Sequence, residues 1–140
     1  MQKFLIPFDG SENALRAIRY AATLAQEKPS IKLELLCVIE PMPLRSIAGL
    51  DQAEITHLYF AEATRVLEPA RQALNQYGIT CEQHYRIGDP ANEIAAQVRE
   101  KSFDGVIMGT RGMGQIANLM IGSVATRVVH LVQVPVTLIK

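Results

Sequence analysis

The sequence lacks three features that would point to particular classes of protein: an excess of charge of one sign, closely spaced cysteines and a long hydrophobic run. Its 14 basic and 14 acidic residues give a net charge of zero, whereas nucleic-acid-binding domains usually carry a basic excess or a basic stripe. Cys37 and Cys81 form no CxxC pair, and His57, His84 and His130 share no metal-ligand spacing. No stretch approaches the ~18 apolar residues that cross a bilayer. We therefore predict no nucleic-acid partner, no membrane span and no metal site.

The first residues also lack the pattern of a secretory signal. The apolar run over residues 4–8 is short, and the acidic residues Asp9 and Glu12 follow it closely. We expect a cytoplasmic protein, where a disulfide between the two cysteines is disfavoured.

The chain is rich in short apolar runs that alternate with longer amphipathic ones. Its 140 residues, 49% of them hydrophobic, suit one domain over residues 1–140. The pattern predicts strands over residues 4–8, 31–39, 79–87, 104–108 and 134–139, and helices over 12–27, 51–77, from 90 onward and over 123–132. This alternation favours a single-domain, doubly wound α/β fold: a five-stranded, parallel, Rossmann-like sheet. We predict the strand order 3-2-1-4-5.

Several local signals mark where the helices begin and end. Ser11 is a predicted N-cap, and Asp89 with Pro90 predicts the start of another helix. Gly78 is predicted to end the helix over 51–77, and Pro69 inside that helix predicts a kink or a break. Residues 41–50, with two prolines and a glycine, are predicted to form a loop that either closes over a ligand or lies on the surface.

The most informative stretch follows the fourth predicted strand. Gly109 and Gly112 are followed, after nine residues, by Gly122 and Ser123. We expect Gly109 to let the backbone approach a ligand, and Gly112 to need a positive φ or the same close approach. Ser123 begins the last helix, where free N–H groups and the helix dipole favour a phosphate. The spacing matches neither the P-loop nor the compact GxGxxG motif.

This G-x2-G-x9-G-[S/T] pattern resembles the nucleotide signature of the universal stress protein family. Similarity to the family extends along the whole chain. Residues 6–11 resemble its opening strand and turn, 38–40 the end of its second strand, 88–90 the start of its third helix, and 134–139 its closing strand.

The resemblance implies an ATP site at the carboxyl ends of the strands, where order reverses. It implies nucleotide contacts from Pro7, Phe8, Asp9, Val38, Met108, Gly109, Thr110, Arg111, Gly112, Gly122, Ser123 and Val124. Asp9 would face the ribose or the adenine edge, Pro7 and Val38 would wall the adenine, and Ser123 would help to hold the outer phosphates. Ala125 stands where many ATP-binding members carry a second hydroxyl.

Positive charge is scarce around this predicted site. The segment 113–121 carries no lysine, and Arg111 is the basic residue nearest to it. We therefore expect Mg²⁺ to accompany ATP, bound to the phosphates and otherwise held mostly by water. Arg127, one turn into the last helix, is predicted to be solvated or ion-paired, with the outer phosphates within its reach.

The residues predict no catalytic group at these loops. Hydrolysis needs an aligned water, a base and charge stabilisation, and no carboxylate, Ser-His or Cys-His pair is visible there. We predict a nucleotide sensor or binding module with slow or no ATP hydrolysis. An adenylyl-transfer enzyme would need a richer phosphate loop at residues 9–12, and a phospho-accepting receiver domain would need an acidic pair after the first strand and an aspartate after the third.

Less specific interpretations stay open for two site residues. Asp9 could serve only to stabilise its turn, and Ser123 only to cap its helix. The family resemblance further implies a homodimer that pairs through the last strand, residues 134–139. A member of the family that binds no nucleotide and acts only through this dimer surface, or a weak ATPase, is the alternative to the ATP-binding sensor.

Overall fold

The computed structural model describes residues 1–112 and 121–140. Its strands are β1 (Gln2–Pro7), β2 (Ile31–Ile39), β3 (Glu82–Ile87), β4 (Gly105–Gly109) and β5 (Val136–Ile139). Its helices are α1 (Glu12–Glu27), α2 (Leu44–Ile47), α3 (Gln52–Gln76), α4 (Pro90–Lys101) and α5 (Ser123–Leu131).

The five strands form one parallel sheet in the order β3-β2-β1-β4-β5. The predicted fold class and strand order are therefore confirmed. Strands β1 and β4 pair with Phe4 opposite Gly105, although they are far apart in the sequence. Because the order of the strands reverses at this pair, the loops after β1 and β4 diverge and leave room at the carboxyl edge of the sheet.

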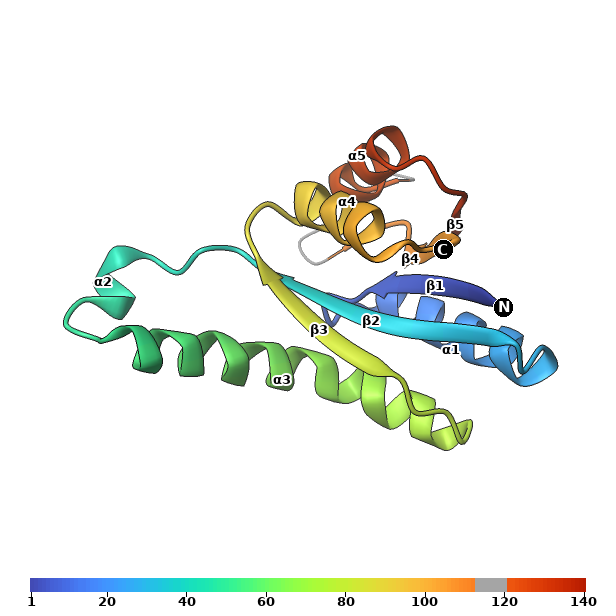
Figure 1. Cartoon of the computed structure of the whole chain (residues 1–140), viewed down its shortest axis with the longest axis horizontal. Helices are drawn as coiled ribbons and strands as arrows, with labels where there is room; N and C mark the ends of the chain where they lie inside the picture. The colour runs from blue at the N-terminus through green and yellow to red at the C-terminus, as the bar shows by residue number, and fades with distance from the viewer. Residues whose placement is uncertain (113–120) are drawn as a thin grey trace.

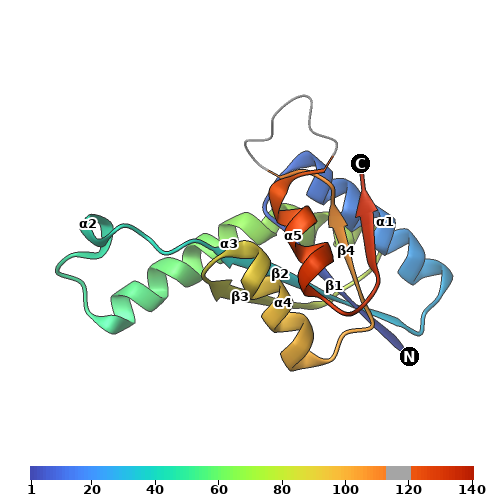
Figure 2. The same ribbon diagram turned by 90° about the horizontal axis from the view of Figure 1, so that it is seen from above.

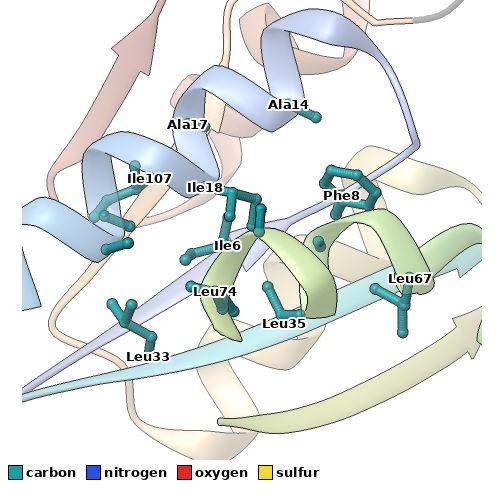
Figure 3. Packing of buried hydrophobic residues seen from close by; sticks show 14 of the residues in the cluster. Ile6, Phe8, Ala14, Ala17, Ile18, Leu33, Leu35, Leu67, Leu74 and Ile107 are labelled. Carbon is teal, nitrogen blue, oxygen red and sulfur yellow. The ribbon is translucent and has the colours of Figure 1, made fainter. Parts of the chain in front are cut away.

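Helices cover both faces of the sheet (Figures 1 and 2). Helices α1 and α3 pack on one face, and α4 and α5 pack side by side on the other. On the α1/α3 face, Ile18 of α1 and Leu74 of α3 meet Ile6 and Leu35 from the central strands, all of them buried (Figure 3). These apolar contacts fix the helices against the strands and so position the loops at the sheet edge.

The predicted helix boundaries follow capping chemistry. The hydroxyl of Ser11 accepts a hydrogen bond from the Ala14 backbone N–H at 3.2 Å, and Asp89 caps α4 through the Asn92 N–H at 3.1 Å. Gly78, with φ +72°, follows the last residues of α3. These three predictions are confirmed.

Of the kink or break predicted at Pro69, the break is wrong, because α3 is continuous from Gln52 to Gln76. Pro69 cannot donate to the carbonyl of Arg65. Both residues lie on the exposed side of the helix, where water can bind that carbonyl. On the opposite side, buried Leu67 and Ala70 hold the helix on the sheet, and this packing outweighs the lost hydrogen bond.

The predicted loop over residues 41–50 contains one short helix, α2. Together with the first turns of α3, it projects beyond the end of the sheet (Figure 1). The Met42 N–H donates to the buried Tyr59 hydroxyl at 2.7 Å, which ties the start of this segment to α3.

Among the described residues, none of the helices has the length and apolar character needed to cross a membrane.

Candidate functional site

A cavity of about 510 Å³ lies at the carboxyl edge of the sheet, where the loops after β1 and β4 diverge. All twelve residues of the predicted site line it: Pro7, Phe8, Asp9, Val38, Met108, Gly109, Thr110, Arg111, Gly112, Gly122, Ser123 and Val124. The chain thus brings together the ends of β1, β2 and β4 and the start of α5, segments spread over more than a hundred residues. This volume suits a small ligand such as a nucleotide.

The turn after β1 places the Asp9 carboxylate against Gly112. Its Oδ1 accepts a hydrogen bond from the Ser11 N–H at 2.9 Å, so Asp9 stabilises its own turn as one interpretation expected. A Cβ added to Gly112 would lie 2.5 Å from Oδ2 of Asp9. The glycine permits this close approach, which a Cβ would displace by moving the Asp9 carboxylate, and Gly112 is not among the positive-φ glycines.

Gly109 has a packing role that the sequence did not indicate. A Cβ added there would lie 2.8 Å from the Asn13 Cβ and 2.9 Å from its backbone carbonyl carbon. The glycine therefore lets β4 approach the first turn of α1, and it also lines the cavity.

Gly122 closes the base of the loop that leaves β4. Its N–H donates to the Thr110 carbonyl at 2.5 Å, so the two ends of the segment lie side by side. Gly122 is also the N-cap residue of α5, and Ser123 is the first helical residue. The interpretation of Ser123 as the N-cap is therefore wrong. The N–H groups of Ser123, Val124 and Ala125 have no carbonyl partner within the helix, and all three residues line the cavity.

Two buried polar groups near this edge lack a hydrogen-bond partner in the described part of the chain: Oγ1 of Thr110 and Nδ2 of Asn13. Thr110 lines the cavity and is only 5% exposed. Buried polar atoms normally find a partner. The Thr110 hydroxyl is thus a group that a bound ligand or a water can satisfy.

The charge of the cavity is mixed. Arg111 is the one cationic residue among the described lining residues, and Asp9 and Glu40 are acidic. Glu40 was missed in the sequence because it follows the end of β2 with no recognisable motif.

Five further lining residues were also missed: Ser11, Ala14, Leu36, Pro90 and Ala125. Ser11 had been assigned only its capping role, and Pro90 reaches the cavity from α4, which no local pattern indicates. No residue of the 41–50 segment appears among the lining residues that the structure describes. The predicted lysine-free excursion falls mostly on residues 113–120, which lie outside the described residues.

Arg127 is ion-paired, as one of its two expected states. Its guanidinium donates to both carboxylate oxygens of Asp89 at 3.0 and 2.9 Å and to Asn92 Oδ1 at 3.2 Å. This hydrogen bonding lowers the pKa of the Asp89 carboxyl below its usual value. The pair joins the first turn of α4 to α5 beside the cavity.

The two cysteines are free thiols. Burial is the main factor that raises the pKa of Cys37 to about 11, and the same cause raises the pKa of Cys81 to about 11. Both thiols are therefore protonated and weakly nucleophilic near neutral pH.

Comparison with known proteins agrees with this geometry. The sequence model of the universal stress protein family matches residues 1–140. The universal stress protein YxiE of Bacillus subtilis is 29% identical over 146 residues, which cover 99% of this chain and 98% of YxiE. The solved structure of MJ0577, a universal stress protein of Methanocaldococcus jannaschii, superposes with a TM-score of 0.82 at 26% identity, covering 99% of this chain and 95% of that one.

Three further solved structures share the fold and contain a nucleotide. One universal stress protein is in complex with cAMP, one from Archaeoglobus fulgidus with dAMP, and one from Arabidopsis thaliana has AMP bound. Their TM-scores are 0.76, 0.67 and 0.70, at 21%, 21% and 20% identity. They cover 99%, 100% and 100% of this chain, and this chain covers 97%, 98% and 92% of theirs. At this identity they demonstrate a common fold.

Proposed function

Because the chain belongs to the universal stress protein family, we propose that it binds ATP in the cavity at the carboxyl edge of the sheet and acts as a nucleotide sensor in a stress response. The observation that carries the proposal is the convergence of the four signature residues, Gly109, Gly112, Gly122 and Ser123, on one cavity. Structures of the same fold that hold cAMP, dAMP and AMP support an adenine nucleotide as the ligand class.

The lining includes both apolar and hydrogen-bonding residues, which fits the base and the phosphates of a nucleotide. Pro7 and Val38 offer apolar walls for a base, and Asp9 offers a carboxylate to a hydroxyl of the ribose. For the phosphates, the N-terminus of α5 presents N–H groups with no partner within the helix, and the Thr110 hydroxyl has no hydrogen-bond partner among the described residues. These groups fit phosphate oxygens, which accept hydrogen bonds only.

The neutralisation of phosphate charge is the weak part of the site. Arg111 is the one cation that we find among the described lining residues, and Arg127 is engaged by Asp89. We propose that Mg²⁺ accompanies the phosphates and supplies the remaining positive charge. Asp9 and Glu40 are the acids of the described lining, and no histidine or lysine is among the lining residues that the structure describes. We accordingly propose slow or no hydrolysis.

The first experiment identifies the ligand without assuming it. Freshly purified protein is denatured, and the supernatant is analysed by mass spectrometry for nucleotides. The stripped protein is then titrated with ATP, ADP and AMP, each with and without Mg²⁺, in a calorimeter. We expect near-stoichiometric adenine nucleotide in the supernatant and saturable ATP binding that Mg²⁺ strengthens.

A matched pair of variants assigns the binding to the cavity. Gly122→Val with Ser123→Ala should abolish binding, because a Cβ at position 122 already lies 3.3 Å from the Thr110 carbonyl oxygen and the Arg111 Cα. His130→Ala, at the other end of α5, should bind as the wild type does. If neither the supernatant nor the titration shows a nucleotide, the signature is structural here, and the protein acts through its dimer surface.

That dimer surface is the free edge of β5. In the ladder with β4, the Pro135 and Ile139 carbonyls accept from the Val106 and Thr110 N–H groups at 2.9 and 2.8 Å. Alternate residues of a parallel strand face opposite neighbours, so Val136 and Leu138 direct their backbone groups to the open edge. We propose that a second copy pairs there, since exposed edges are normally paired or covered.

The oligomeric state tests this pairing by light scattering. Val136→Lys with Leu138→Lys should give a monomer, but both side chains pack against the core under α4 and α5, so this variant also risks unfolding. Leu138→Pro removes one outward N–H and leaves the ladder with β4 intact. A folded Leu138→Pro protein that stays dimeric would contradict pairing through β5.

A further inference from the structure

A second cluster of ligating side chains lies on the sheet, away from the nucleotide cavity. Glu34 of β2 and Glu82 and His84 of β3 bring one carboxylate or imidazole atom each to within 4.8 Å of one another. Glu34 is opposite Glu82 in the register, and His84 is two residues further along β3. Since side chains alternate along a strand, all three project from the same face of the sheet.

The distances within the cluster suit a tetrahedral metal ion. The His84 Nε2 lies 3.3 Å from the Glu82 Oε2 and 3.5 Å from the Glu34 Oε2. Two ligands of a tetrahedral Zn²⁺, each about 2.0–2.1 Å from the metal, are separated by about 3.3–3.4 Å. The side chains therefore stand close to a ligating arrangement, and the exposed Glu82 carboxylate is free to rotate into the third position.

The buried carboxylate of Glu34 is the second observation that points to a cation. Glu34 is only 9% exposed and lies two residues before Leu36, a residue of the apolar core. Its Oε1 pairs with the Lys3 Nζ at 3.3 Å, while its Oε2 faces the half-exposed His84. A carboxylate that is withdrawn from water needs compensation: Lys3 supplies it at Oε1, and His84 is the described partner of Oε2.

Lys3 is held as an outer neighbour of this cluster. Its ammonium lies 4.5 Å from the centre of the Phe103 ring and donates to the Lys101 carbonyl at 3.1 Å. These contacts fix Lys3 on the Oε1 side of Glu34 and leave Oε2 directed at His84. Partners of this kind orient the ligands in metal sites.

We propose that Glu34, Glu82 and His84 form a binding site for a divalent transition-metal ion of the Zn²⁺ class, with one position open to water. An imidazole with two carboxylates favours such an ion over Mg²⁺, which prefers oxygen ligands alone. None of the three residues lines the nucleotide cavity. The proposed metal site is therefore independent of the proposed ATP function, and each can be tested without the other.

The test uses Co²⁺ as a spectroscopic probe. The full chain is treated with a chelator, dialysed and titrated with Co²⁺ while its visible absorption is recorded. We expect one Co²⁺ per chain with the intense absorption of a tetrahedral site, and displacement of Co²⁺ by Zn²⁺. Saturable binding that Mg²⁺ at millimolar concentration displaces would contradict the proposal, because it would indicate carboxylate ligands alone.

Three histidine variants locate the ion. His84→Gln should weaken Co²⁺ binding by at least about tenfold, whereas His57→Gln and His130→Gln should leave it unchanged. Glu82→Gln repeats the test at an exposed position, where misfolding is not expected, and circular dichroism confirms the fold of each variant. Absence of saturable binding, or equal binding by the wild type and His84→Gln, would overturn the proposal.

Discussion

The α1/α3 face of the sheet is packed with small apolar side chains, whereas the α4/α5 face combines apolar packing with fixed charges. In the described chain, seventeen buried residues form the core under α1 and α3, and ten form the core under α4 and α5. On the second face, the Arg86 guanidinium joins β3 to α4 through Glu93 at 2.9 Å and Glu100 at 2.8 Å. Arg127 joins α5 to α4 through Asp89.

This difference indicates that the two layers have different roles. The α1/α3 layer holds the central strands in place by close packing. The α4/α5 layer contributes Pro90, Ser123, Val124 and Ala125 to the lining of the cavity. The ion pairs of Arg86 and Arg127 hold α4 and α5 in place.

Matched truncations in the two cores should have the largest effect. Ile18 of α1 is fully buried, and Ile94 of α4 is 3% exposed. Each change to alanine should lower the free energy of unfolding by about 2–5 kcal/mol. Ile18→Ala should lie at the upper end of this range because Ile18 belongs to the larger of the two cores. Urea denaturation measures both. A greater loss for Ile94→Ala would show that the smaller core is the stronger one.

Alanine at the two glycines of β4 should have an intermediate effect. Gly109→Ala forces a Cβ to 2.8–2.9 Å from Asn13, including its backbone, and should cost about 1–3 kcal/mol. Gly105→Ala meets the Phe4 ring at 2.8 Å, which can turn away, so its cost should be smaller. Chemical denaturation of the two variants compares a rigid neighbour with a movable one. Equal losses would mean that the start of α1 yields as easily as the ring.

The smallest effect should come from Asp89→Asn, which keeps an N-cap side chain and removes the charge paired with Arg127. Since the pKa of Asp89 is lowered in the folded state, the pair stabilises the fold above the ordinary carboxyl pKa of about 3.9 and is lost as the pH falls through the lowered value. Thermal unfolding should therefore show a gap between wild type and variant at neutral pH that closes in acid. The gap caused by Ile18→Ala should persist. If the difference in thermal stability between the wild type and Asp89→Asn did not change with pH, the ion pair with Arg127 would not be its cause.

Most helix boundaries could be predicted because they depend on local signals, whereas the strand order was predicted from the doubly wound fold class. Ser11, Asp89 and Pro90 act within one turn of chain, and the alternation of short apolar runs with amphipathic ones indicates a parallel sheet. The break predicted at Pro69 was wrong because the hydrogen bond lost at the proline costs less free energy than the packing of α3 on the sheet contributes. No local sequence pattern contains that packing.

The candidate site was predictable through its glycine spacing, but the reasons for individual residues were not. Gly109 accommodates α1, which a sequence pattern cannot distinguish from accommodation of a ligand. Glu40 and Pro90 line the cavity because the strand register and the crossover connections bring the end of β2 and the start of α4 to the same edge of the sheet. The Glu34, Glu82 and His84 cluster depends on the pairing of β2 with β3, so its ligands show no spacing along the chain.

The central position of β1 has a consequence for the order in which the chain folds. During synthesis β1 can pair with β2 early, but its other neighbour, β4, lies roughly a hundred residues further along, and synthesis takes several seconds to cover that distance. A nascent chain that ends before Gly105 therefore presents β1 as an open strand edge, with Leu5 and Leu36 not yet covered by α5. Such an edge invites pairing with other chains. The vulnerable period in the life of this protein is thus the interval before its last third has left the ribosome.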